Sequence, residues 1–409
     1  MKFQKLIARI PNYGAFVALQ RSAIFSESCY PQYITWNKVT WRPTPTPKRK
    51  LVPWYLMSAL VVSVTINFLS FATWEIVSHQ KDPDLNFVGI LMLVFYICAN
   101  VLATVVIGSF VSKVDEICFV MGNLQTIKEV VDDGIDQSDF VGLLLHFMIP
   151  APVSTPLTVA AATILLENVD PTYFWFRDFI LISSPVKMLL RISIMSIVVF
   201  HGAMAIFTFL VNLANVALSF HCCLRSMTST NYFRNYLQTE NDTHSLDIAT
   251  QSRIFKAATK FGNSARFSQC LIKYRQLQIV AAVQNQVLIY LLPISLVVAV
   301  AGCVVVGYLV IKLTGAVPIP LSILCSFVLV LIIAAAHALI PLAAEVFIKS
   351  EFFVRFWKLQ SFSGYRKRQL KSCKLLRISV GPFFRIKKGS RVIFLSVVLY
   401  HTVTLVISV

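Results

Sequence analysis

Long runs of apolar residues alternate with short polar segments along the whole chain. Six of these runs cover 51–77, 87–111, 140–166, 191–220, 287–313 and 321–347, and a seventh covers roughly 392–409. A helix needs about 20 apolar residues to cross the hydrocarbon core of a bilayer. The pattern therefore predicts an all-α fold, a seven-transmembrane helical bundle.

Charged residues set the expected orientation of this bundle. Lysine and arginine gather in 1–50, 221–286 and 348–391, and the other connections carry few of them. The first inner loop, 112–139, is acidic in its second half and does not help. Cytoplasmic loops carry an excess of Lys and Arg, so we expect a cytoplasmic N-terminus and, after seven spans, an extracellular C-terminus.

Four segments follow from this orientation. We expect a cytoplasmic N-terminal segment over 1–50 and the first six spans over 51–347, with cytoplasmic helical extensions in 221–286. A basic cytoplasmic segment over 348–391 precedes the seventh span, 392–409.

The last helix is expected to be split into a cytoplasmic part and a membrane part. Lys371, Lys374 and Arg377 belong to a basic stretch that we expect to be a short helix, ending at Gly381–Pro382 because proline disfavours helical continuation. The span that follows carries scattered polar residues. Their side chains either form hydrogen bonds to the backbone of the same or a neighbouring helix, or they face water along a pore. They are Ser390, Ser396, Tyr400, His401, Thr402, Thr404 and Ser408.

Composition narrows the function class. Hydrophobic residues make up 56% of the chain and charged residues 14%, with a formal net charge of +18. A soluble domain does not have this balance. The basic residues lie between apolar runs, so we expect them to face the anionic surface of the lipid bilayer and not nucleic acid.

Catalytic and metal-binding patterns are absent from the sequence. Cysteines show no metal-ligand spacing, and His146, His337 and His401 stand isolated from candidate catalytic partners. We therefore expect no cofactor, no metal site and no enzyme activity.

Four stretches resemble the arthropod (insect-type) gustatory and odorant receptor superfamily. They are KRQLKSCKLLRI (367–378), SVGPFFRIKKGS (379–390), YPQYITWNKVTW (30–41) and ENVDPTYFW (167–175). The resemblance implies a chemosensory receptor in the plasma membrane of a sensory neuron dendrite. It further implies a homo- or hetero-tetramer with related subunits that acts as a ligand-gated non-selective cation channel, gated by a small-molecule tastant or odorant.

The resemblance also implies particular site residues. The family ends in TYxxxxxQF and lines its pore with the last span. The best register gives Thr402, Val406 and Val409 as pore-lining residues, with Val406 at the gate. Only the threonine of the motif matches, because Val403 and Val409 replace its Tyr and Gln and the final Phe is absent. This departure leaves the ion selectivity open.

The family's ligand pocket lies in the outer halves of spans two to six. On the expected topology its candidate residues are Phe95, Tyr96, Phe200, His201 and Tyr308. An apolar pocket with a few polar tips suits small hydrophobic or sugar-like ligands. Ordinary packing between spans is the alternative for each of these side chains.

Two other classes of membrane protein stay open at this point. A G-protein-coupled receptor also has seven spans, but the charge pattern places the N-terminus inside, and the outer connection 167–190 contains no cysteine. A secondary transporter usually carries buried charges in mid-span and inverted repeats. The spans here carry almost no charge, with Lys312 and Glu345 near span ends.

Overall fold

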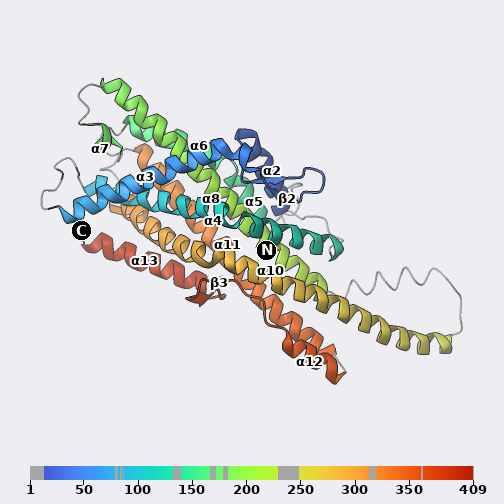
Figure 1. Ribbon diagram of the computed structural model, residues 1–409. Helices are drawn as coiled ribbons and strands as arrows, with labels where there is room; N and C mark the ends of the chain where they lie inside the picture. The colour runs from blue at the N-terminus through green and yellow to red at the C-terminus, as the bar shows by residue number, and fades with distance from the viewer. Residues whose placement is uncertain are drawn as a thin grey trace.

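A computed structural model describes residues 13–78, 82, 85, 87–131, 140–165, 172–177, 183–228, 248–312, 319–360 and 363–408. Its longest helices lie along one common direction (Figure 1). The helices are α2 (Ala15–Cys29), η1 (Lys48–Leu51), α3 (Val52–Val77), α4 (Phe87–Val131), α5 (Phe140–Met148), α6 (Ala151–Leu165), α7 (Tyr173–Phe176), α8 (Ser184–Thr228), α10 (Ile248–Lys312), α11 (Ile319–Gln360), α12 (Gly364–Ser372) and α13 (Ser390–Ser408). The strands are β1 (Ile34–Trp36), β2 (Pro43–Pro45), β3 (Ser379–Val380) and β4 (Phe384–Arg385).

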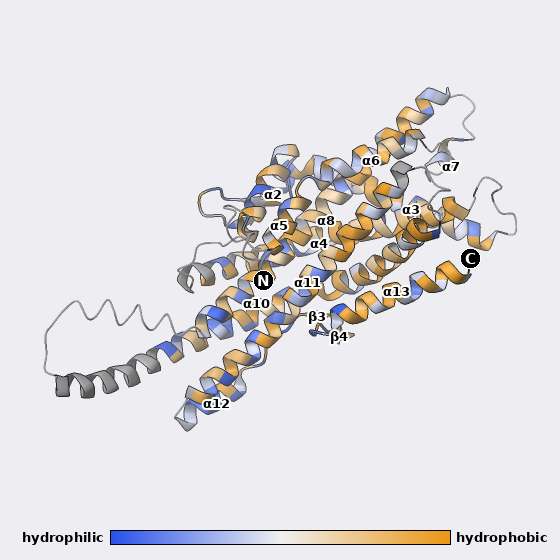
Figure 2. Ribbon diagram, turned by 180° about the vertical axis from the view of Figure 1, so that it is seen from behind, coloured by the Kyte–Doolittle hydropathy of each residue, from blue (hydrophilic) through white to orange (hydrophobic). Residues whose placement is uncertain are grey.

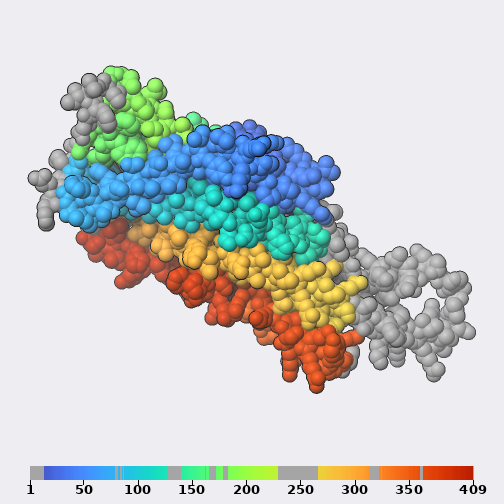
Figure 3. All heavy atoms as spheres, in the orientation of Figure 1, coloured from blue at the N-terminus to red at the C-terminus, as the bar shows by residue number. Residues whose placement is uncertain are grey.

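Two ends of the bundle serve as reference points. Figure 1 shows α7 and the C-terminal end of α13 at one end, and α12 at the other; we name these the α7 end and the α12 end. In Figure 3 the last part of the chain, coloured orange to red, runs along one long edge of the molecule.

Membrane-spanning helices dominate the fold. Within the described residues, six helices are long and apolar enough to cross a bilayer, and the bent pair α5–α6 makes a seventh candidate. Most residues of these helices are hydrophobic (Figure 2), as lipid contact requires. The prediction of an all-α bundle with seven spans is confirmed, with two small β-hairpins added.

The third span is broken where its prolines predict a kink. Helix α5 ends at Met148 and α6 begins at Ala151, with a bend of 46° between them. Pro150 lies at the break and supplies no N–H for a continuous helix. Pro156, in contrast, is accommodated inside α6.

The second span continues beyond its predicted end. We expected a polar stretch with a solvated helix end from residue 112, and α4 runs on to Val131 as two helical parts joined at a kink. Only Lys113, with φ −132° and ψ 22°, departs from helical geometry. The continuation buries Val120 and Leu124, so packing stabilises a helix that hydropathy alone ends too early.

The predicted split before the seventh span is present, but the helix that precedes it contains Lys371 and ends before Lys374 and Arg377. Helix α12 ends at Ser372, Cys373 has extended backbone angles, and residues 373–378, which we call the strap, belong to neither helix nor strand. A hairpin follows, pairing Ser379 with Arg385 and Val380 with Phe384. Its turn requires φ of +53° at Gly381, a conformation that glycine adopts without steric cost.

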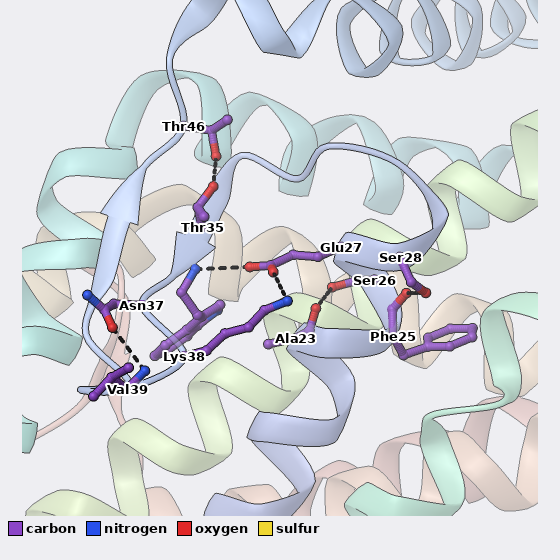
Figure 4. Close-up of polar contacts among 11 residues, drawn as sticks. Ala23, Phe25, Ser26, Glu27, Ser28, Thr35, Asn37, Lys38, Val39 and Thr46 are labelled. Carbon is purple, nitrogen blue, oxygen red and sulfur yellow. Dashed lines mark hydrogen bonds and ion pairs between the residues drawn. The ribbon is translucent and has the colours of Figure 1, made fainter.

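The N-terminal segment folds into α2 and the β1–β2 hairpin against the bundle. The Trp36 N–H donates to Glu27 Oε1 at 2.9 Å, and Lys38 Nζ lies 3.9 Å from Glu27 Oε2 (Figure 4). Thr35 and Thr46 join across the two strands through hydroxyls 2.6 Å apart. A single carboxylate therefore ties α2 to the hairpin.

Candidate functional site

A cavity of about 1760 Å³ lies among the spanning helices. Helices α4, α6, α8, α10, α11 and α13 supply its walls, and the β3–β4 hairpin borders it as well. The small side chains of Ala99, Ala203 and Ala299 line it together with larger apolar ones such as Phe207 and Leu292. Small residues on facing helices leave space that large residues would fill, so the cavity follows from the sequence of the spans.

Away from the β3–β4 hairpin and α13, few polar side chains line this cavity, and three of them donate to helical backbone. Asn100 Nδ2 donates to the Tyr96 carbonyl oxygen at 2.9 Å. The hydroxyls of Thr155 and Ser295 donate to carbonyls one turn back, at 2.9 and 2.6 Å. Each hydroxyl oxygen keeps lone pairs that can accept a hydrogen bond. The described walls can therefore offer these oxygens as acceptors inside an apolar space.

The predicted ligand-binding residues divide into two groups. Phe95 and Tyr96 line the cavity, and their ring centroids lie 6.0 Å apart. Phe200, His201 and Tyr308 do not line it.

His201 instead joins three segments of the chain. It is fully buried, with Nδ1 2.8 Å from the Tyr30 hydroxyl and Nε2 2.8 Å from the Ser58 hydroxyl. Its ring also packs against Trp54, with centroids 5.2 Å apart. Trp54 and Ser58 lie in the first turns of α3, so His201 is placed near the start of that helix and holds the segment before β1 against α3 and α8.

Tyr30, Phe200 and Tyr308 have packing roles in the same core. The Tyr30 and Phe200 ring centroids lie 5.9 Å apart, and burial raises the pKa of Tyr30 above its ordinary value. The phenol is therefore kept protonated as a hydrogen-bonding group. Tyr308 is 2% exposed and makes an edge contact with Phe87 at 5.6 Å.

Helix α13 presents three different faces. Phe394, Val398 and Thr402 are buried, and Thr402 lies against Gly307 of α10. A second face lines the cavity, through residues three or four positions apart, as a helical stripe requires: Ile393, Val397, His401, Thr404 and Ser408. The third face is turned away from the bundle: Leu399, Tyr400, Val403 and Ile407.

The predicted pore residues lie on different parts of this helix. Thr402 is 5% exposed and donates its hydroxyl to the Val398 carbonyl at 2.8 Å. Val406 is half-buried and borders the face of α13 that is turned away from the bundle, which we call the open face. Val409 lies outside the described residues. In the single chain, the open face therefore begins beside Val406 and not at Thr402.

The strap is held by side chains of α10 and α11. Tyr274 Oη donates to the Lys374 carbonyl at 3.0 Å and lies 2.7 Å from Ser350 Oγ. That Ser350 oxygen accepts the Leu376 N–H at 2.8 Å. Farther along α10, Asn285 donates to the Arg377 carbonyl at 2.9 Å and accepts the Ser379 N–H at 2.9 Å. These bonds satisfy backbone groups that a helix would have satisfied internally, so the strap need not be helical.

Residues outside the sequence prediction contribute most of the cavity. Asn100 has the clearest signal, because it follows Tyr96 by four positions and so lies on the same helical face. The strap contacts had no such signal, because polar side chains on a helix beyond its apolar run are usually solvated. In the part of the chain that the structure describes, no group of three or more His, Cys, Asp or Glu residues could hold a metal ion.

Comparison with solved structures finds the same overall fold in an insect olfactory receptor. The receptor OR5 from Machilis hrabei matches 95% of this chain and 97% of its own, with a TM-score of 0.57 and 11% sequence identity. Its structure in complex with eugenol matches 96% and 98%, with a TM-score of 0.52 and 12% identity. No family model and no curated protein matches the sequence. The chain has the fold of an insect olfactory receptor.

Proposed function

We propose that this chain is a subunit of a chemosensory receptor, of the odorant or gustatory type, that acts as a ligand-gated non-selective cation channel. One observation carries the proposal: an apolar cavity inside an olfactory-receptor fold is bordered by α13. This helix is the last span, which lines the pore in the receptor superfamily that the sequence resembles. We further propose a tetramer of this or related subunits in the plasma membrane, with the N-terminus cytoplasmic and the C-terminus extracellular.

The chemistry of the cavity favours a small, mainly apolar ligand with one hydrogen-bond donor. The hydroxyl oxygens of Thr155 and Ser295 can accept a hydrogen bond from a ligand. Burial of the ligand's apolar surface against the apolar walls is favourable. A sugar would lose many bonds to water that these few atoms cannot replace. Eugenol, the compound in the second solved structure, is a ligand of that receptor; a small odorant of similar polarity is the class we propose here.

Gating follows from walls that the ligand and α13 share. Most residues of α10 between Leu292 and Val305, and the stripe on α13, border the cavity. A ligand shifts a conformational equilibrium only through different affinities for the two states. A ligand that fits better when α13 has moved relative to α11 therefore favours the open channel. Thr402, Val406 and Val409 remain the proposed pore-lining residues.

The proposal is tested by recording ligand-evoked currents from cells that express the chain, with and without a related subunit. In Ala203→Phe a bulky ring enters the cavity from α8, and we expect the response to a small odorant to fall at least tenfold. Ala161→Phe is the matched control, because Ala161 is exposed on α6 and does not line the cavity.

A topology measurement accompanies the recordings. Epitope tags before Met1 and after Val409 are stained before and after permeabilisation. We expect the C-terminal tag on intact cells and the N-terminal tag only after permeabilisation. The reverse pattern, or currents that need a G protein, contradicts the proposed channel and returns a G-protein-coupled receptor to consideration.

A further inference from the structure

The cavity has a basic mouth at the β3–β4 hairpin. Arg385 and Lys387 line it there, and Lys388 and Arg391 follow in the chain. Among the described residues, no carboxylate lies within ion-pair distance of these four cations. Arg391 makes a contact of 3.4 Å to His337 Nε2. Positive charge is therefore concentrated at the mouth without a neutralising partner from the described chain.

An apolar trough leads away from this mouth along α13. The cavity-lining stripe runs from Ile393 through Val397 to Ser408, within a helix of 19 residues. At 1.5 Å per residue, such a stripe extends about 22 Å. The acyl chains of one leaflet fill about half of a ~30 Å hydrocarbon core, so the trough is long enough for an acyl chain.

The size of the cavity exceeds what a small ligand needs. Pockets for drug-sized ligands have volumes of roughly 300–1,000 Å³, whereas this cavity measures about 1760 Å³. A single small odorant among α4, α6 and α8 leaves the part beside α13 unfilled. Apolar space of that size beside lipid is favourably occupied by a hydrocarbon chain.

Two aromatic residues place the mouth at the membrane surface. Phe383 and Phe384, on and beside the hairpin turn, have exposed fractions of 74% and 51%. In Figure 2 the hydrophilic hairpin adjoins the hydrophobic start of α13. Exposed aromatics beside lysine and arginine are typical of segments at the boundary between headgroups and acyl chains.

We propose that the hairpin and the trough together bind one anionic phospholipid. Its phosphate is held by Arg385 and Lys387, and one acyl chain lies along Ile393, Val397 and His401. The basic mouth selects a net negative headgroup over a zwitterionic one, since a zwitterion brings its own cation to an already positive site. The site needs a membrane setting but not channel activity.

Lipid binding to the purified full-length chain tests this directly. The chain in mixed micelles is titrated with phosphatidylglycerol, with phosphatidylcholine as the zwitterionic comparison, and bound lipid is counted by native mass spectrometry. We expect about one tightly held phosphatidylglycerol and at least tenfold weaker binding of phosphatidylcholine. In Arg385→Gln/Lys387→Gln, phosphatidylglycerol affinity falls at least tenfold. The matched control is Lys367→Gln/Arg368→Gln, which removes the same charge from exposed positions of α12.

A second variant tests the trough without touching the charge. Val397→Trp narrows the trough, and we expect it to weaken phosphatidylglycerol binding while the basic mouth stays intact. It also remains informative if the charge variant folds poorly.

Three outcomes overturn the proposal. An equal loss in the α12 control shows diffuse attraction to positive charge. Equal binding of the two lipids shows that the headgroup is not recognised. Competition by inorganic phosphate together with an unaffected Val397→Trp variant shows a free-anion site. These experiments measure lipid binding and not ion currents. Their outcome is therefore independent of whether the proposed channel function is correct.

Discussion

Thr402 of α13 lies directly against the backbone of Gly307 on α10. A Cβ atom placed on Gly307 would lie 3.0 Å from Thr402 Cγ2 and 3.3 Å from its Oγ1. Such distances are shorter than ordinary contacts, so the two helices can approach this closely only because residue 307 has no side chain. The packing of α13 depends on one glycine.

Replacing this glycine should separate the two helices. Gly307→Ala is expected to lower the thermal midpoint of unfolding, because Thr402 must move. Gly302→Ala is the matched control in the same helix, since its Cβ would meet nothing within 4 Å. There, alanine should be neutral or stabilise by about 0.4–1 kcal/mol through reduced backbone entropy of the unfolded chain. Equal midpoints for the two variants would contradict the close contact.

Ser350 should matter more than its size suggests. It is fully buried, and Ser350→Ala leaves the Leu376 N–H without its acceptor, at a cost of about 1–3 kcal/mol. We expect a lower thermal midpoint and faster trypsin cleavage after Lys374 and Arg377, in the released strap. Ser372→Ala, at an exposed position of α12, is the control. Unchanged cleavage in Ser350→Ala would show that the strap is held elsewhere.

The strap should also hide a thiol. Burial raises the pKa of Cys373 above its ordinary value, so less reactive thiolate exists at neutral pH and alkylation should be slow. The rate should rise with pH as the raised pKa is approached. Ser350→Ala should speed labelling of Cys373, read by peptide mass mapping, with exposed Cys29 as the internal standard. Equally fast labelling of both cysteines in the unmodified chain would contradict a docked strap.

A polar residue at the proposed gate should increase leak. Val406 borders the open face of α13, and a ring of valine side chains can close a pore by excluding water. Val406→Ser is therefore expected to raise resting conductance severalfold at normal surface expression. Val330→Ser makes the same change on an exposed face of α11 and should leave conductance unchanged. No leak in Val406→Ser, with leak in Ile407→Ser, would shift the pore register by one residue.

The spans could be predicted because their signal is local. About 20 apolar residues in a row are sufficient evidence for a spanning helix, and Pro150 marks a break in the third. The close helix contact at Gly307 had no comparable signal, because it depends on which residue of another helix lies opposite. The same holds for His201, because its hydrogen-bond partners Tyr30 and Ser58 lie 171 and 143 positions away in the chain.

The strap shows why local signals fail at the end of the basic segment. Its sequence around Lys374 and Arg377 has no helix breaker before Gly381, and a helix was the natural expectation. The chain is not helical there because Tyr274 and Asn285, about a hundred positions earlier, satisfy its backbone. Contacts across such a separation override local propensity and cannot be read from the segment itself.

Helix α10 fastens the path to α13 at two separated places. It holds the strap through Tyr274 and Asn285, and it receives Thr402 at Gly307. Because the chain leading through α13 is attached to α10 at two points, α13 cannot slide or pivot along α10 while both contacts are intact. In the proposed gating, α10 and α13 therefore move together relative to α11, and that movement also strains the bond from the Leu376 N–H to Ser350 of α11. A molecule lodged in the trough would act there as a spacer, and its girth would limit how far the pair can travel.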